Sequence, residues 1–338
     1  MLLVSQSFFC FSFQCKYITF EKYILKIRIF RNFQEAKTVF RILLGIQKYL
    51  SFIKFSHSVF ALPFALIGFI TAIWLNAKTI KTEPTEIIFI LFKVIACMVF
   101  ARSAAMGFNR LADKEIDRKN SRTQIREIPS GKISVSSAVY FVIITSIGFC
   151  LSALWINSLC FYLSPVALLI ILGYSFTKRF TWLSHFILGL GLSLSPIGAY
   201  IAFTGKFDVN FLIIINYSVA ILCWVSGFDI IYSLQDTEFD RKEGLYSIPS
   251  KFGIHKALLI SRILHLLTSF FLITAGYYSG YGVIYWLGTL IFISMLFYQH
   301  TLVKPNDLSH VNVAFFTTNG IASICLVVFL IFDIFISF

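Results

Sequence analysis

The chain has 338 residues, of which 58% are hydrophobic, 17% aromatic and only 13% charged, and its mean hydropathy is +0.81. These values lie far above those of ordinary soluble domains, so the composition excludes a soluble globular protein. The net charge is +13, but no motif of interleaved basic and aromatic residues accompanies it, and this argues against nucleic-acid binding.

Nine apolar stretches are long enough to cross a hydrocarbon core that is roughly 30 Å thick. In chain order, the predicted spans are residues 56–76, 86–106, 136–155, 158–176, 182–203, 211–232, 258–279, 282–299 and 313–336. We therefore expect an all-α, polytopic membrane protein, with one transmembrane domain over residues 51–338. Residues 1–50 form a basic extension, in which 20–50 are expected to lie as an amphipathic segment on the membrane surface.

The basic residues are distributed unevenly between the two ends of the spans. Residues 1–55 hold nine Lys and Arg, 107–135 hold seven and 233–257 hold four, whereas no connection on the opposite side holds more than two. The positive-inside rule then predicts that the N-terminus and the basic loops are cytoplasmic and that the C-terminus is outside. Topology and contact with anionic lipid therefore account for the net charge.

The seven cysteines show no CxxC spacing, and the six histidines show no metal-ligand spacing. Both sets are interpreted as packing or interfacial residues, because a disulfide or zinc framework requires closely spaced pairs.

Two loops on the predicted cytoplasmic side resemble each other and are rich in carboxylates. They are NRLADKEIDRKNSRTQIREIPSGK (109–132) and DIIYSLQDTEFDRKEGLYSIPSKFG (229–253), and both end in Ile-Pro-Ser followed by a glycine. Nine of the 16 acidic residues lie in 113–127 and 229–243. The two halves of the chain therefore look like copies of one supersecondary unit.

The spacing within each loop predicts a polar stripe on a helix. In the first loop the stripe is Asn109, Asp113 and Asp117, at i, i+4 and i+8 of a helix that continues the second span, with Arg110 beside them. In the second loop, offsets of 0, 3, 7 and 11 define the stripe Asp229, Tyr232, Asp236 and Asp240. Glu238 and Glu243 fall off this stripe and are expected to be solvated.

Carboxylates aligned in this way repel one another, and near a membrane interface the cost rises unless a cation neutralises them. Two facing stripes would form an oxygen-lined site suited to Mg²⁺, which proteins usually hold with one or two carboxylates and the phosphate oxygens of a substrate. A diphosphate is the natural third component. The interleaved basic residues are expected to clamp it, namely Arg118, Lys119, Arg122, Arg126, Arg241 and Lys242.

The patterns NRxxDxxxD and DxxYxxxDxxxD resemble the two signature motifs of the UbiA-type intramembrane aromatic prenyltransferases. Three further stretches resemble that family's first span, post-motif loop and fifth span, namely HSVFALPFALIG (57–68), RTQIREIPSGKIS (122–134) and SPIGAYIA (195–202). The resemblance covers roughly residues 50–337. One departure is Ser233, where an alanine is common after the tyrosine, and we expect no consequence from it.

The resemblance implies nine helices around a central cavity capped by the two acidic loops, and transfer of a polyprenyl chain from its diphosphate to an aromatic acceptor with Mg²⁺. It assigns one Mg²⁺ to Asn109, Asp113 and Asp117, and a second to Asp236 and Asp240, with the four aspartates as the catalytic residues. The implied substrate-binding residues are Asn109, Arg110, Arg122, Tyr174, Ser175, Lys178, Arg179, Asp229 and Tyr232.

The stretch from Ala101 to Gly131 resembles the branch that prenylates 4-hydroxybenzoate. This implies ubiquinone or menaquinone biosynthesis in a bacterial inner membrane, with polyprenyl diphosphate, an aromatic acid and the lipid bilayer as partners and no feature that requires a protein partner. The alternative acceptor is 1,4-dihydroxy-6-naphthoate, which is also a hydroxylated aromatic acid, and both acceptors stay open.

Two other kinds of protein fit the sequence less well. A transporter would place ionisable residues near the middle of its spans, where the candidates here are Lys93, His185, His265 and Asp333. A phosphatidyltransferase that uses CDP-activated alcohols requires a DxxDGxxAR run, and the chain contains none.

Overall fold

The computed structural model describes residues 47–53, 62–77 and 82–337, and the described elements are helical. The chain divides into two units, residues 1–51 and 52–338, and the long apolar helices belong to the second. Most of the amphipathic segment expected at 20–50 lies outside the described residues, as does the predicted start of the first span at 56–61.

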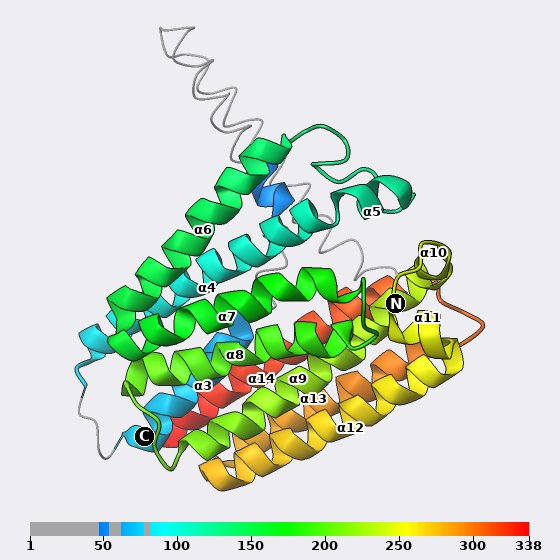
Figure 1. Ribbon diagram of the computed structural model, residues 1–338. Helices are drawn as coiled ribbons and strands as arrows, with labels where there is room; N and C mark the ends of the chain where they lie inside the picture. The colour runs from blue at the N-terminus through cyan, green and yellow to red at the C-terminus, as the bar shows by residue number, and fades with distance from the viewer. Residues whose placement is uncertain (1–46, 54–61, 78–81, 338) are drawn as a thin grey trace, which may run out of the picture. The chain divides into compact units, whose positions relative to one another are not determined.

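Eight long apolar helices and one shorter one form the bundle in the described part of the second unit (Figure 1). They are α3 (Leu62–Asn76), α4 (Pro84–Ala112), α6 (Val135–Ile156), α7 (Ser158–Thr177), α8 (Ser184–Thr204), α9 (Phe211–Ser233), α12 (Ile254–Ser279), α13 (Val283–Leu302) and α14 (Thr318–Ser337). Eight of them are long and apolar enough to cross a membrane, and α3 is a shorter apolar helix. The prediction of an all-α membrane protein is confirmed.

Short helical segments connect the long helices at one end of the bundle (Figure 1). They are α5 (Lys114–Lys119), the 3₁₀ turn η2 (Leu234–Asp236), α10 (Thr237–Lys242) and α11 (Ile248–Phe252). The π-helical turn η3 (Val313–Thr317) precedes α14. Both acidic loops of the sequence contain these short segments, and the bundle brings the two loops to the same end.

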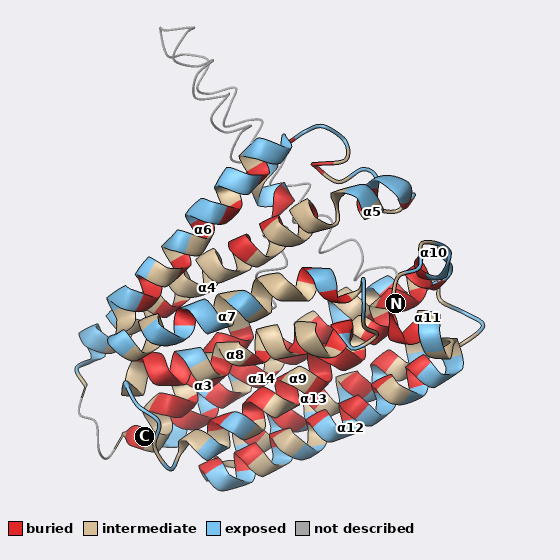
Figure 2. Ribbon diagram, viewed as in Figure 1, coloured by how far each residue is buried: buried red, intermediate tan, exposed pale blue. Residues whose placement is uncertain are grey.

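Helix α9 is the most deeply buried of the described spans, and it packs against α8 on one side and α12 on the other. Figure 2 shows buried residues concentrated along α9 and exposed residues along the outer face of α6. Trp224 anchors the core around α9, with ring centroids 5.3 Å from Phe64 and 4.8 Å from Phe292, and its indole Nε1 donates to Asn319 Oδ1 at 3.0 Å. Since these partners come from α3, α13 and α14, one side chain joins four helices.

Three of the four ionisable residues predicted at depth have structural roles. The buried Asp333 carboxylate accepts the backbone N–H groups of Gly282, Ile284 and Tyr285 at 2.7 to 3.2 Å, and so caps the N-terminus of α13. Lys93 lies over the rings of Phe89 and Trp155. His265 Nδ1 lies 2.9 Å from His300 Nε2, in a pair between α12 and α13. Only His185 lies at the acidic end of the bundle, as described below.

We expect Gly68→Ala to destabilise the bundle, because a Cβ on Gly68 would lie 2.2 Å from the backbone oxygen of Pro196 on α8. Backbone atoms cannot move aside as a side chain does, so α3 and α8 must separate, at a cost of about 1–3 kcal/mol. Thermal unfolding of the purified protein in detergent measures the effect. The matched control is Gly173→Ala on α7, where nothing lies within 4 Å of the new Cβ. Equal melting temperatures for the two variants would contradict this packing.

Candidate active site

The first acidic stripe is not carried by one continuous helix, as the sequence predicted. Helix α4 ends at Ala112 and α5 begins at Lys114, with Asp113 between them at φ −93° and ψ 9°. Asn109 Nδ2 donates to Asp113 Oδ2 at 3.1 Å, so these two side chains do face each other. Asp117 follows on α5, where its two carboxylate oxygens accept from one guanidinium nitrogen of Arg126 at 2.7 and 2.8 Å.

The second stripe is also interrupted. Asp229 and Tyr232 lie on α9, Asp236 ends the 3₁₀ turn η2, and Asp240 lies on the separate helix α10. The continuous helical stripe predicted from the spacing is therefore wrong beyond Ser233, although all four side chains stay at the same end of the bundle. The tighter 3₁₀ turn changes the direction of the chain after α9, because it has fewer residues per turn than an α-helix.

Arg122 joins the two loops. Its guanidinium pairs with the Asp236 carboxylate, including a bond of 3.1 Å from Nε to Oδ1, and its Nη1 donates to the Tyr232 hydroxyl at 2.9 Å. Asn120 Nδ2 donates to Asp236 Oδ1 at 3.1 Å from the same loop. Residues that are 110 or more positions apart in the chain thus form one connected polar cluster.

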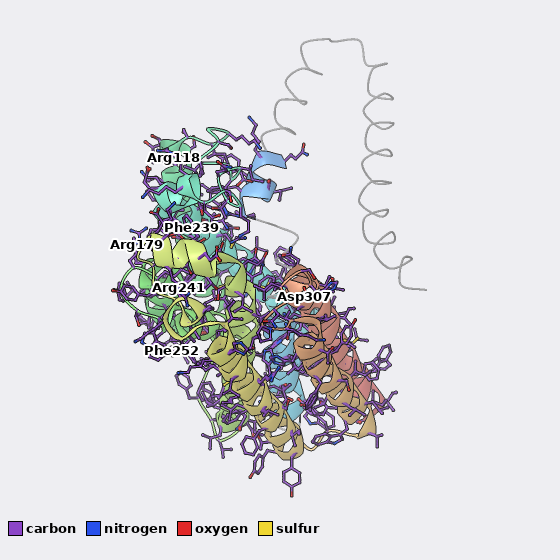
Figure 3. The ribbon with its side chains drawn as sticks, turned by 90° about the vertical axis from the view of Figure 1, so that its right-hand side faces the viewer. Arg118, Arg179, Phe239, Arg241, Phe252 and Asp307 are labelled. Atoms are coloured by element: carbon purple, nitrogen blue, oxygen red, sulfur yellow. The ribbon has the colours of Figure 1, made fainter. Side chains whose placement is uncertain are left out.

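Lys178 is the cation that both loops share. It caps the C-terminus of α7, and burial on its own would lower the pKa of its ammonium group. The carboxylates around it outweigh burial and raise that pKa above its usual value; they are Asp240, Asp229, Asp236 and Asp113. Arg179 follows, with a guanidinium nitrogen 3.6 Å from Asp113 Oδ1 and a hydrogen bond to the carbonyl of Ala112 at the end of α4. Figure 3 shows Arg179 at the same end of the molecule as Arg118 and Arg241.

The neighbouring cations do not fully compensate the negative charge of the Asp113 carboxylate. Burial raises the pKa of its carboxyl group, and the neighbouring Asp117 raises it further, while Lys178, Arg179 and Arg126 act in the opposite direction. The net direction is upward, so the charged form of Asp113 is disfavoured in the protein as it stands. An additional cation at this place would stabilise the carboxylate.

His185 is a member of the site that the sequence did not reveal. The fully buried ring on α8 lies with Nδ1 2.7 Å from Asp229 Oδ2, and its Nε2 accepts the backbone N–H of Ile248 at 3.3 Å. Because Nε2 accepts, the proton lies on Nδ1, which donates to Asp229. His185 therefore holds Asp229 in place and ties α11 to α9. No sequence spacing links positions on two separate helices, so only the packing could identify it.

Several basic residues that were predicted to clamp a diphosphate have other partners. Arg118 pairs with Glu115 in an exposed bridge, and Arg241 donates to the carbonyl of Ser250. Lys119 Nζ lies 2.6 Å from Glu243 Oε2 in an exposed pair, so Glu243 is partly solvated, as expected, and also forms a second bridge between the loops. Glu238 and Lys242 are exposed, the former as expected.

The remaining predicted residues lie beneath the loops. Arg110 is buried on α4 and interacts electrostatically with Glu127 and Asp117. Tyr174 lies near both Asp113 and Asp229 on the last turns of α7. The hydroxyl of Ser175 is buried without a hydrogen-bond partner among the described residues. All three residues therefore lie in the last turns of α4 and α7, next to the acidic cluster.

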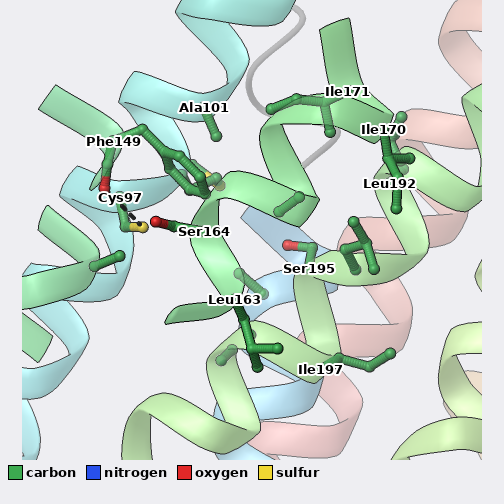
Figure 4. A pocket seen from close by; sticks show the side chains of 18 of the residues that line it. Cys97, Ala101, Phe149, Leu163, Ser164, Ile170, Ile171, Leu192, Ser195 and Ile197 are labelled. Carbon is green, nitrogen blue, oxygen red and sulfur yellow. Dashed lines mark hydrogen bonds between the residues drawn. The ribbon is translucent and has the colours of Figure 1, made fainter. Parts of the chain in front are cut away.

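An apolar cavity of about 390 Å³ adjoins this region, and residues of α3, α4, α6, α7 and α8 line it (Figure 4). Its walls are mostly aliphatic and aromatic, with Ser164 and Ser195 among the polar exceptions in Figure 4. Tyr174 also lines it, so the cavity reaches the same side chain that lies near Asp113 and Asp229. Tyr174 therefore borders both the polar cluster and the apolar cavity.

Among the described residues, no three His, Cys, Asp or Glu side chains lie close enough together to form a metal-binding group. Arg122 and Arg126 hold two of the candidate carboxylates in ion pairs. The donor set nevertheless fits a hard cation, since it consists of carboxylate and amide oxygens. The buried Asp240 Oδ2 also has no hydrogen-bond partner in the described part of the chain, and such an atom favours a ligand.

Comparison with known proteins identifies the family. The model of the UbiA prenyltransferase family matches residues 61–321. The chain belongs to this family. It is therefore an integral membrane prenyltransferase, as the motifs predicted, and aromatic prenyl transfer is its class of reaction.

Relatives of known name and structure agree with this assignment. The 4-hydroxybenzoate octaprenyltransferase of Shewanella frigidimarina is 30% identical over 258 residues, which cover 75% of this chain and 88% of that protein. The corresponding enzyme of Coxiella burnetii is 32% identical over 241 residues, covering 70% and 80%. A UbiA homolog from Aeropyrum pernix K1, solved in its apo form, is 30% identical with a TM-score of 0.72, covering 82% of this chain and 98% of that one.

A solved structure with lower sequence identity is similar to this chain in its fold. The UbiA homolog from Archaeoglobus fulgidus solved with GPP and Mg²⁺ is 19% identical with a TM-score of 0.63, covering 85% of this chain and 99% of that one.

We expect a double-mutant cycle of Arg122→Ala and Asp236→Ala to give a coupling energy of about 1–3 kcal/mol in the unfolding of the detergent-solubilised protein. The pair is partly buried and bonded at two atoms, so each single variant leaves a charge without its partner. The control cycle is Arg118→Ala with Glu115→Ala, whose side chains are 61% and 62% exposed and whose coupling should stay below about 0.5 kcal/mol. Additive effects in both cycles would show that Arg122 does not join the loops.

Proposed function

We propose that this protein catalyses Mg²⁺-dependent transfer of a polyprenyl group from polyprenyl diphosphate to a hydroxylated aromatic acid, 4-hydroxybenzoate first among them, in quinone biosynthesis. The observation that carries the proposal is the convergence of two acidic loops on the shared cations Arg122 and Lys178. The names of the curated relatives support the acceptor, since they are 4-hydroxybenzoate octaprenyltransferases that this chain matches over most of their length.

Two groups of oxygen ligands would hold the metal ions. Asn109, Asp113 and Asp117 form the first, and Asp236 and Asp240 the second. When bound, Mg²⁺ neutralises the negative charge of a diphosphate and makes it a better leaving group. The Archaeoglobus fulgidus homolog, solved with GPP and Mg²⁺, supports a prenyl diphosphate and a divalent cation as ligands.

The protein's own cations would bind and orient the diphosphate. Lys178 and Arg179 lie in the turn after α7, among the carboxylates of both loops. Arg122 and Arg126, both in the first acidic loop and each beside a ligand carboxylate, would contact the diphosphate oxygens as well. Charge-assisted hydrogen bonds from guanidinium groups suit phosphate oxygens in geometry and strength. Asp229 and Tyr232 would line the same pocket, with His185 fixing Asp229.

The reaction then needs a dry site. The allylic C–O bond of the donor breaks and its electron pair leaves on the diphosphate. An electron-rich ring carbon of the acceptor forms the new C–C bond, and the ring loses a proton and regains its aromaticity. Water would capture the allylic cation, so exclusion of water is essential. The aliphatic walls of the cavity beside Tyr174 provide that exclusion.

The proposal also includes the orientation of the protein in the membrane and the residues that form its catalytic domain. With the basic loops in the cytoplasm, the acidic cluster faces the compartment that holds soluble aromatic acids, and the C-terminus lies outside. We assign this orientation to a bacterial inner membrane. Residues 51–338 would form the catalytic domain and 1–50 a membrane-surface extension; the family match over 61–321 supports the first assignment.

We expect Asp113→Ala and Asp236→Ala each to lower the prenylation rate by at least about 10²-fold, because each removes a ligand oxygen from one metal group. The assay supplies membranes with polyprenyl diphosphate, Mg²⁺ and, separately, 4-hydroxybenzoate or 1,4-dihydroxy-6-naphthoate, and measures prenylated product. Glu238→Ala is the matched control, since Glu238 is exposed and lies between the ligands in sequence.

Three results of this assay are decisive. A product with the naphthoate alone would replace the acceptor assignment. Absence of any Mg²⁺-dependent product from the wild-type protein would refute the proposed function. Full activity of both aspartate variants would refute the metal assignment while leaving the function intact.

A further inference from the structure

The last long helix begins with an unusual turn. Helix α14 is preceded by η3, a π-helical turn over Val313–Thr317, which packs against both α9 and α13. Single π-helical turns are rare and often occur at functional sites. The sequence of this turn, VAFFT, contains no charged residue, so any part that it plays in the site must come from packing.

Two buried amide side chains hold the turn in place. Gln299 Nε2 on α13 donates to the carbonyl oxygen of Ala314 at 2.6 Å. Asn319 Nδ2 donates to the carbonyl oxygen of Phe315 at 2.8 Å, and the Oδ1 atom of the same amide accepts from the indole of Trp224 in the core. The backbone around Phe315 is therefore fixed by α13 and by the core around α9.

The fixed backbone places the ring of Phe315 against the ring of Tyr232. The two ring centroids are 4.2 Å apart, with an interplanar angle of 31°. Phe228, one turn earlier on α9, meets Phe315 edge-on at 5.3 Å. The guanidinium carbon of Arg122 lies 5.3 Å from the centroid of Tyr232, and its Nη1 donates to the tyrosine hydroxyl at 2.9 Å. Tyr232 is therefore in contact with Phe315 and Arg122 at the same time.

Tyr232 connects this contact to the acidic loops. It is the second-to-last residue of α9, directly before the turn η2 that contains Asp236. The Arg122 guanidinium that donates to its hydroxyl also pairs with the Asp236 carboxylate. A rotation of the Tyr232 ring would therefore release or move this guanidinium. Phe315 opposes such a rotation, because the two rings pack closely at a shallow tilt.

We propose that Phe315 is a positioning residue for diphosphate binding. Its ring holds the Tyr232 hydroxyl, and through it the Arg122 guanidinium, in the orientation that contacts the diphosphate oxygens. This inference rests on the proposed function. Phe315 is only half-buried, and it packs on a residue of the site. Phe292, by contrast, is 1% exposed and packs on Trp224 in the core.

The test measures diphosphate binding and acceptor binding separately. Phe315→Leu removes the ring but keeps an apolar side chain. The purified protein is titrated calorimetrically with inorganic diphosphate and Mg²⁺, and KM is measured for polyprenyl diphosphate and for 4-hydroxybenzoate. We expect Kd for diphosphate and KM for polyprenyl diphosphate to rise by about 3- to 10-fold, the effect of losing one aromatic pair. KM for 4-hydroxybenzoate should stay within about two-fold.

A second substitution tests whether Phe315 acts through the tyrosine hydroxyl. Tyr232→Phe keeps the ring and removes the bond to Arg122. In this background we expect Phe315→Leu to weaken diphosphate binding by less than about two-fold, because the two residues act on one interaction. Phe315→Tyr keeps the ring and should bind diphosphate within about two-fold of the wild-type protein. Independent, multiplying effects of Phe315→Leu and Tyr232→Phe would overturn the proposal.

Phe292→Leu is the matched control, since it removes a core ring that lies 4.8 Å from Trp224. We expect it to lower the melting temperature at least as much as Phe315→Leu and to change diphosphate affinity by less than about two-fold. Equal losses of affinity in the two variants would show that only stability is affected, and the role of Phe315 would be refuted. If Phe315→Leu does not fold, Phe315→Met replaces it, because a flexible side chain fills an irregular space.

The titration also separates this inference from the proposed function. A wild-type protein that binds no diphosphate would contradict both the diphosphate site and the role of Phe315. Intact diphosphate binding without any prenylated product would refute the proposed function alone, and the titration of the variants would still test Phe315.

Discussion

The structure depends on compensating the negative charge of a cluster of carboxylates at one end of an apolar bundle. Asp113, Asp229, Asp236 and Asp240 surround Lys178, and Arg122 binds Asp236 from the opposite loop. Without these cations, mutual repulsion and poor solvation near the membrane would drive the loops apart. The same arrangement that makes the cluster tolerable also concentrates charge where a diphosphate and its metal ions would bind.

The packing of the long helices positions the charged residues of this cluster. Helix α9 is held in the core by Trp224 and carries Asp229 and Tyr232 at its end. Packing of α8 against α9 then brings His185 to Asp229, and the same histidine accepts from Ile248 on α11. A buried, well-packed frame therefore supports the site and keeps its residues in place.

The cluster and the cavity differ in polarity. Charged groups gather at the end of the bundle, whereas the adjoining cavity is almost entirely apolar and contains the single guanidinium of Arg102 among the described Lys and Arg residues. An allylic cation needs protection from water, and the apolar walls of the cavity would supply it. Tyr174 borders both regions, since it lines the cavity and lies near Asp113 and Asp229.

The sequence by itself determined the class of protein, the order of its spans and the two acidic motifs, because hydrophobic length and residue spacing are local properties. It also brought Asn109 and Asp113 together correctly, since a single helical turn separates them. It failed where the helix ended: spacing cannot foresee that α4 stops before Asp113 or that η2 turns the chain after α9. Only the tertiary structure decided the partners of the charges, since Arg122 with Asp236, Lys119 with Glu243 and His185 with Asp229 join residues that lie 44 to 124 positions apart. The packing of the long helices sets these distances, and no local pattern in the chain records it.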